Sequence, residues 1–281
     1  MKGMSTCTTS QSKLPDSRAS YIEREFHLVK ELIDPIYGEV KLLTDVNNSN
    51  DIFCKTYIID SSAELEHTVS LLKKRLELKH PYLFGLLDYS YQRHSNWCST
   101  SYTVKAYYHY NDHSFSKELE IRKACNKSFG DEELATLLFE QSEVLTYLQS
   151  SNFAHGDIRP GAIFLKKDDS AVSTALCERL STIEIKNCQL EHIHLNRNLY
   201  MSPTLFTSLI SRKSKFQFNQ WKSDAFSFGL VLLEAATLSS VQGIYDKRNG
   251  LIHVGAIDGL LGVMERKYPN SSWIVGVVRK L

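Results

Sequence analysis

The sequence predicts an α+β fold with a small β-rich amino-terminal part, which includes one helix, and a large, mainly α-helical carboxy-terminal part. Strand-like runs rich in β-branched and aromatic residues follow one another from Phe26 to Tyr57. Residues 131–150 combine an acidic start with the apolar spacing of a long amphipathic helix. Residues 251–268 and 271–281 predict two further helices. Strands followed by helices are typical of the α+β class.

The composition of the chain argues against several classes of function. Its 281 residues are 42% hydrophobic, which suffices for an ordinary core, and a formal net charge of +1 gives no reason to expect a nucleic-acid or membrane partner. No apolar run approaches the roughly 20 residues that cross a bilayer, and the amino terminus has no apolar signal core. The six cysteines, interpreted as having no CxxC motif and no paired spacing with histidine, argue against a zinc site and a disulfide framework. They indicate a reducing compartment, so we expect an intracellular, cytoplasmic protein.

The amino-terminal part begins with a tail and continues with strands. Residues 1–20 are polar, rich in Ser and Thr and without periodicity, and predict a disordered tail. The strands that follow read FHLVKELI, EVKLLTDV and IFCKTYII. An asparagine-rich turn over residues 47–51 separates the last two strands and is a hairpin signal.

Helical and strand-like segments then alternate. Residues 61–78 have an apolar stripe at helical spacing, and one of the two serines at their start can cap the helix. The run FGLLDYSY continues as a strand, and residues 101–110 form another. A polar connection leads to the helix of residues 131–150.

A short polar loop, His155-Gly156-Asp157-Ile158-Arg159-Pro160, follows that helix and precedes an apolar run. Loops of this kind carry chemistry because a rigid scaffold presents their polar side chains. The stretch resembles the catalytic loop of eukaryotic protein kinases, His-Arg-Asp-x-Lys-Pro-x-x-Asn. The resemblance places Asp157 at the catalytic base and Arg159 at the lysine of that loop. Gly156 replaces the arginine, and Ala162 replaces the asparagine that would hold a magnesium ion.

A second motif carries the same resemblance. Residues 223–234, SDAFSFGLVLLE, are similar to the kinase motif Ser-Asp-Val-Trp-Ser-Phe-Gly-Val-Val-Leu-Leu-Glu. In that family this is the buried central helix of the large lobe, and its aspartate, here Asp224, accepts hydrogen bonds from the catalytic-loop backbone. The resemblance makes His155 the other structural anchor. Tyr200-Met201-Ser202-Pro203-Thr204 resembles Tyr-x-Ala-Pro-Glu, with Thr204 in place of the glutamate.

The resemblance covers about residues 25–281 and implies a bilobal protein-kinase-like fold. It assigns residues 21–108 to the N-lobe and residues 109–281 to the C-lobe. The family has a further helix whose arginine pairs with the glutamate of Ala-Pro-Glu. The sequence ends before that helix, so we expect the C-terminal edge of the C-lobe to be incomplete.

The resemblance also implies a nucleotide site with altered parts. Pro35 stands where the family has a glycine that lets backbone amides approach phosphate. Phe53 stands where a small alanine covers the adenine, and Lys105 falls at the gatekeeper position. The implied nucleotide-binding residues are Gly38 and Val40 of the glycine-rich loop, Lys55 at the phosphate-binding lysine, and Ala106 and Tyr107 in the hinge.

The helix glutamate and the metal ligand differ from the family as well. Thr68 falls where a glutamate would pair with Lys55, and Glu64, one turn earlier, is an alternative partner. Glu178 falls at the aspartate of Asp-Phe-Gly and is the candidate metal ligand, because a carboxylate can bind Mg²⁺. Its extra methylene displaces the carboxylate, which octahedral Mg²⁺ tolerates poorly. Residues 181–199 correspond to the activation segment.

Phosphoryl transfer needs the phosphate cradle, the lysine–glutamate pair, the metal ligands and the base together. Because several of these are altered, we expect a pseudokinase: a binding, scaffolding or allosteric module with weak or absent phosphoryl transfer, no required cofactor and a protein partner. The alternative is a divergent but active Ser/Thr-type kinase that uses ATP and Mg²⁺ with Lys55, Asp157 and Glu178 on a protein substrate. A third reading is a fragment of a larger multidomain protein whose partner covers the open end of the large lobe.

Overall fold

A computed structural model of the chain describes residues 18–34, 38–45, 51–95, 99–111, 113–165, 172–175, 182–213 and 216–281. Pro35, most of the asparagine-rich turn and the metal-ligand candidate Glu178 lie outside these residues. The chain divides into two compact units. One consists of Met1–Lys79 and Phe84–Asn111, and the other of His80–Leu83 and Asp112–Leu281.

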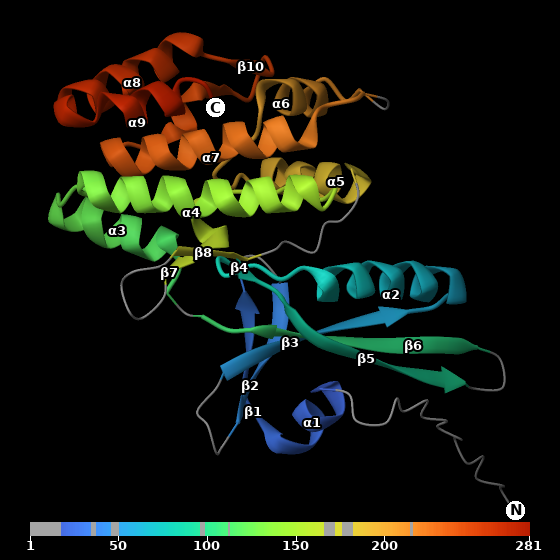
Figure 1. The fold of residues 1–281 in the computed structure, drawn as a ribbon. Helices are drawn as coiled ribbons and strands as arrows, with labels where there is room; N and C mark the ends of the chain where they lie inside the picture. The colour runs from blue at the N-terminus through green and yellow to red at the C-terminus, as the bar shows by residue number, and fades with distance from the viewer. Residues whose placement is uncertain are drawn as a thin grey trace, which may run out of the picture. The chain divides into compact units, whose positions relative to one another are not determined.

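The first unit is built on a five-stranded antiparallel sheet with the strand order β1-β2-β3-β6-β5 (Figure 1). Its elements are α1 (Arg18–Glu25), β1 (Phe26–Asp34), β2 (Gly38–Asp45), β3 (Asp51–Ile59), α2 (Ser62–Glu77), β5 (Leu86–Ser95) and β6 (Thr100–His109). The two-residue strand β4 (Leu83–Phe84) falls at the division between the units. The predicted strands and the predicted helix of this unit are present, and Ser61 caps α2 by accepting a hydrogen bond from the Glu64 N–H at 3.2 Å.

The two faces of this sheet carry different clusters, because successive residues of a strand point to opposite sides. Cys54 of β3 and Tyr107 of β6 lie opposite each other in register and pack with buried residues of α1. The adjacent pair, Phe53 and Tyr108, faces the other side, where the two rings stack with centroids 4.9 Å apart. The buried guanidinium of Arg75, on α2, donates a hydrogen bond to the Tyr108 hydroxyl at 3.2 Å. The sheet is therefore covered by α1 on one face and by α2 on the other (Figure 1).

The second unit is mainly helical. Its elements are α3 (Phe115–Cys125), α4 (Asp131–Ser150), the 3-10 turn η1 (Pro160–Ala162), β7 (Ile163–Leu165), β8 (Val172–Ala175), α5 (Thr182–His194), α6 (Pro203–Ile210), α7 (Gln220–Thr237), η2 (Val241–Ile244), β9 (Tyr245–Asp246), β10 (Leu251–Ile252), α8 (Val254–Lys267), η3 (Pro269–Ser271) and α9 (Ser272–Val278). β7 pairs antiparallel with β8, and β9 with β10. Together with the sheet of the first unit, these helices confirm the α+β class.

Helix α7 forms the centre of the core of the second unit. Every residue from Ser227 to Thr237 is buried, and a helix that is apolar on all sides is typical of an enclosed position. Helices α4, α8 and α9 pack against it (Figure 1). The apolar run of residues 223–234 therefore lies inside this unit.

One charged residue of α7, Glu234, is buried with two partners. Lys123, near the end of α3, places its Nζ 2.7 Å from Oε1 of Glu234. The hydroxyl of Tyr200 donates a hydrogen bond to the other carboxylate oxygen. Burial and the adjacent Glu234 carboxylate raise the pKa of Tyr200, so the phenol stays protonated and remains a donor. These contacts tie α3 and the segment before α6 to the central helix.

Several features differ from the predictions, among them the helix α3, which lies in the segment predicted as a polar connection. Residues 18–20, which the sequence assigned to the polar tail, begin α1, and Ala19 is buried at 1% exposure. The segment compared with an activation segment contains the helix α5. The short β9–β10 pair was not predicted. In the described ranges, no helix is both long enough and apolar enough to cross a membrane.

Candidate functional site around Asp157

The loop that carries Asp157 is held by Asp224 of α7. The backbone N–H of His155 donates to Asp224 Oδ2 at 2.7 Å, and the N–H of Gly156 donates to Oδ1 at 2.8 Å. Burial raises the pKa of Asp224 to about 7, although both hydrogen bonds act in the opposite direction. The contact between Asp224 and the loop backbone is the one that the sequence assigned to this residue. His155 is itself fully buried, and its Nδ1 accepts a hydrogen bond from the Asp157 N–H at 3.3 Å.

Gly156 allows α5 to pack closely against this loop. Its φ of +77° lies in the left-handed region that favours glycine. A Cβ built at this position would lie 2.5 Å from Cγ1 of Ile185, on α5. Any larger residue at this position would collide with the helix. The carbonyl oxygen of Gly156 also accepts a hydrogen bond from Gln189 Nε2 at 2.8 Å.

The Asp157 carboxylate is buried among side chains of the loop and of α5, with 3% of its side chain exposed. Arg159 donates through Nε to Asp157 Oδ2 at 3.1 Å. His192 Nε2 lies 3.0 Å from Asp157 Oδ1, and Gln189 Nε2 lies 3.5 Å from the same oxygen. The structure therefore brings His155, Asp157, Arg159 and Asp224 together and surrounds the carboxylate with contacts from α5, while the catalytic role that the resemblance implies for Asp157 stays a prediction.

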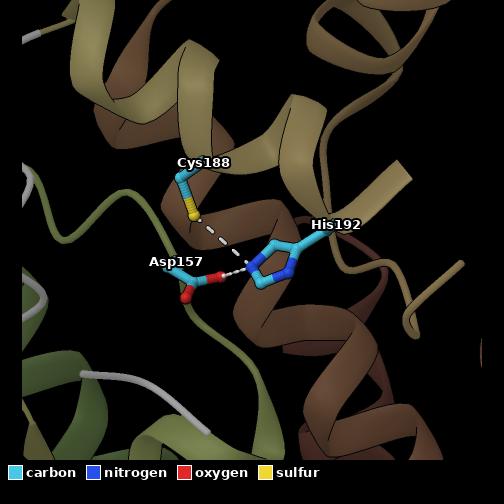
Figure 2. A group of neighbouring side chains, drawn as sticks. All are labelled: Asp157, Cys188 and His192. Atoms are coloured by element: carbon cyan, nitrogen blue, oxygen red, sulfur yellow. Dashed lines mark hydrogen bonds and ion pairs between the residues drawn. The ribbon is translucent and has the colours of Figure 1, made fainter. Parts of the chain in front are cut away.

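Sequence reasoning missed two residues of this cluster, Cys188 and His192 (Figure 2). Cys188 Sγ lies 3.4 Å from His192 Nε2. The possible ligand atoms of Asp157, Cys188 and His192 all lie within 4.8 Å of one another, and all three residues are buried. The interpretation that no cysteine has a paired spacing with histidine was wrong: Cys188-x-x-x-His192 is such a spacing, because residues four apart share one face of a helix. Nothing in the sequence alone placed that face on Asp157.

The candidate nucleotide-binding residues lie in the first unit. Lys55 of β3 is directly opposite Ala106 of β6, and its ammonium lies 5.3 Å from the ring centroid of Tyr57. Val40 of β2 is buried, and Gly38 begins that strand. These positions are adjacent in one sheet, as the resemblance implies for the lysine and the glycine-rich hairpin. Their use in nucleotide binding stays a prediction.

The hinge assignment needs a correction. β6 continues through Ala106 and Tyr107 and pairs with β3 on one side and with β5 on the other. In such a central strand the backbone N–H and C=O groups are engaged by both neighbours. The two residues therefore lie inside the sheet and not at a free edge. The reason is that β6 continues past these residues to His109.

The assignment of Lys105 to the gatekeeper position also needs a correction, because this residue faces the opposite side of the sheet from Lys55. Lys105 and Tyr107 lie on the face covered by α1, opposite to the face of Phe53 and Lys55. Glu23 of α1 accepts a hydrogen bond from the Tyr107 hydroxyl at 2.9 Å and lies 3.4 Å from Lys105 Nζ. Burial would raise the pKa of Glu23, but the hydrogen bonds from Ser90, Tyr107 and Lys105 outweigh it and hold that pKa below its usual value.

Comparison with known proteins adds no identification. The chain matches no protein-family model, and no curated protein matches it significantly. The function must therefore be inferred from the residues and their contacts.

Proposed function

We propose that the protein is a bilobal protein-kinase-like domain of the pseudokinase type, a binding, scaffolding or allosteric module with weak or absent phosphoryl transfer. The observation that carries this proposal is the burial of Asp157, which stands at the position of the catalytic base. Its carboxylate oxygens are in contact with Arg159 and His192. The order of the sequence motifs and the contact of Asp224 with the loop support the kinase-like part.

A general base must approach the hydroxyl that it deprotonates to about 2.6–3.2 Å. Asp157 has 3% of its side chain exposed, and Ile185 lies against the preceding glycine. A substrate hydroxyl could reach the carboxylate only if α5 moved away. Ala162, at the position of the magnesium-binding asparagine, is fully buried and offers only a methyl group. Asp157 is therefore too enclosed to act as a base, and Ala162 cannot bind the metal ion at the position of the asparagine.

The alternative is a divergent but active Ser/Thr-type protein kinase. One observation favours it: Asp224 holds the backbone of the loop by two short hydrogen bonds, so the loop is braced although the chemistry around it has changed. Such an enzyme would use ATP and Mg²⁺ with Lys55, Asp157 and Glu178, and it would need a state in which α5 leaves Asp157. Its substrate would be a protein hydroxyl, whereas the pseudokinase would bind a protein partner without modifying it.

A phosphoryl-transfer assay separates the two proposals. The full chain is incubated with ATP labelled in the γ-phosphate and a generic protein acceptor, with Mg²⁺ or with chelator, and the Asp157→Asn variant is tested in parallel. We expect no Mg²⁺-dependent transfer above the background of Asp157→Asn, and no Mg²⁺-dependent rise in melting temperature with ATP. Transfer that requires Mg²⁺ and disappears in Asp157→Asn would establish the active kinase instead.

A further inference from the structure

Three chemically different side chains of the second unit converge at one buried point. Asp157 comes from the loop after α4, whereas Cys188 and His192 come from successive turns of α5 (Figure 2). Cys188 is 4% and His192 2% exposed. Each of these side chains loses hydration on burial and needs a hydrogen-bond partner or an ion there. This cluster does not depend on the resemblance to kinases.

The separations suit a tetrahedral metal ion. Zinc bonds of about 2.0–2.3 Å at tetrahedral angles place neighbouring ligand atoms about 3.3–3.8 Å apart. His192 Nε2 lies 3.4 Å from Cys188 Sγ and 3.0 Å from Asp157 Oδ1. The distance between Nε2 and Sγ falls in this range, whereas that between Nε2 and Oδ1 is a hydrogen-bond distance that would have to lengthen on binding; all three ligand atoms lie within 4.8 Å of one another. The i, i+4 spacing on α5 keeps the cysteine and the histidine on one face.

The same contacts do not suit a nucleophilic cysteine. In a nucleophile–histidine–acid relay the two partners contact different ring nitrogens, so that the acid orients the ring while the other nitrogen accepts the proton. Here both Asp157 and Cys188 contact Nε2 of His192. His192 Nδ1, in turn, has no hydrogen-bond partner among the described residues. In the described state Nε2 donates to the Asp157 carboxylate, which can only accept, so zinc binding requires the ring proton to move to Nδ1 and leave the Nε2 lone pair for the ion.

We propose that Asp157 Oδ1, Cys188 Sγ and His192 Nε2 bind one Zn²⁺, with a water molecule as the fourth ligand. A thiolate and an imidazole favour Zn²⁺ over Mg²⁺ and Ca²⁺, which prefer oxygen ligands. Binding releases the Cys188 thiol proton to solvent, and the ion then neutralises the thiolate and the Asp157 carboxylate. Arg159, which holds the other oxygen of Asp157, acts as a positioning residue.

Bound zinc would join α5 to the loop of Asp157. The sequence was interpreted as arguing against a zinc site, because it contains no CxxC motif and was taken to have no paired cysteine–histidine spacing. The proposed ligands instead combine a Cys-x-x-x-His pair with an aspartate 35 residues before the histidine. Such a set becomes visible only when the loop and the helix are brought together.

The proposal is tested by metal titration of the metal-free full chain. We expect one Zn²⁺ per chain, a rise in melting temperature with Zn²⁺ but not with Mg²⁺, and a thiolate-to-metal absorption band when Co²⁺ replaces Zn²⁺. Cys188→Ser should weaken Zn²⁺ binding by more than the 10- to 100-fold typical of losing an outer partner, and Arg159→Ala by roughly 10- to 100-fold. The exposed residues His194, on the same helix, and Cys125 supply the matched controls His194→Ala and Cys125→Ser, whose affinity should equal that of the wild type.

Several outcomes would overturn the proposal. They are a wild-type chain that takes up no Zn²⁺, a Co²⁺ form without the thiolate band, and equal Zn²⁺ affinity in Cys188→Ser. If Cys188→Ser does not fold, as judged by circular dichroism, the wild-type stoichiometry and the Co²⁺ spectrum decide alone. Neither readout involves ATP, so the result does not depend on whether the protein transfers phosphate.

Discussion

Replacing Gly156 by alanine tests how closely α5 packs on the loop of Asp157. The added methyl group would lie 2.5 Å from Cγ1 and 2.9 Å from Cδ1 of Ile185, and the residue would have to keep a φ of +77°. The left-handed backbone costs a non-glycine residue about 1–2 kcal/mol, and overpacking in a close-packed interior costs about 1–3 kcal/mol. We therefore expect Gly156→Ala to lower the free energy of unfolding by about 2–5 kcal/mol in urea denaturation.

Two further variants show whether the collision is the cause. Gly156→Ala combined with Ile185→Ala should cost less than the sum of the single changes, because the shortened side chain removes the collision and leaves only the backbone cost. Gly259→Ala is the matched control: this glycine lies within α8, and an added Cβ there would have no neighbour within 4 Å. It should stabilise the chain by roughly 0.5–1 kcal/mol. If Gly156→Ala unfolds at the same urea concentration as the wild type, α5 does not pack on the loop as described.

Three other changes test separate parts of the structure. Burial raises the pKa of Asp224 from 3.8 to about 7, so the folded state holds the proton of this carboxyl more tightly than the unfolded state does. The contribution of Asp224 to the free energy of unfolding therefore falls as the pH rises from about 4 to about 7 and is constant above that. Denaturation at several pH values should show this slope reduced in Asp224→Asn, and an unchanged slope would contradict the assignment. Lys123→Met leaves Glu234 buried with one partner fewer, and should lower the free energy of unfolding by about 1–3 kcal/mol because Lys123 is partly solvated. Adding Glu234→Gln should recover part of this loss. A double variant whose effect equals the sum of the two single effects would argue against the pair. Ser61→Ala removes the cap of α2 and should cost about 1 kcal/mol in thermal denaturation, whereas Ser62→Ala, one residue later, should have little effect.

The parts of the fold that could be predicted are those whose signal is local. Helix α4 spans Asp131–Ser150, the range predicted, because an acidic first turn and an apolar stripe specify it without help from distant residues. Ser61 likewise caps α2 through a contact three residues along the chain. Helix α1 was missed because its sequence, RASYIERE, is short and mostly polar. It is stabilised by packing on the sheet, which its own residues do not reveal.

In the candidate site, too, only the features specified by local sequence could be predicted. The motifs were sufficient to relate Asp157, Arg159 and Asp224 to one loop. They did not show that α5 would cover that loop, because the contact depends on Gly156 having no side chain and on Ile185 lying opposite it. The hinge was misplaced for a related reason: the comparison assumed that a strand ends near Ala106, whereas β5 pairs with β6 as far as Tyr108 and β3 pairs with it as far as His109. Both corrections come from neighbours that are remote in sequence.

The reactivity of the Cys54 thiol can report whether α1 is packed on the sheet. This thiol is buried beneath the helix, and burial raises its pKa, so it should react slowly with alkylating reagents while α1 stays in place. Because a short terminal helix is among the first segments to detach, the labelling rate of Cys54 would measure that opening directly. A shortened protein that begins at Phe26 would lack α1, which covers Cys54, and Glu23, which accepts the hydrogen bond from Tyr107. Deletions from the amino terminus should therefore stop before Arg18.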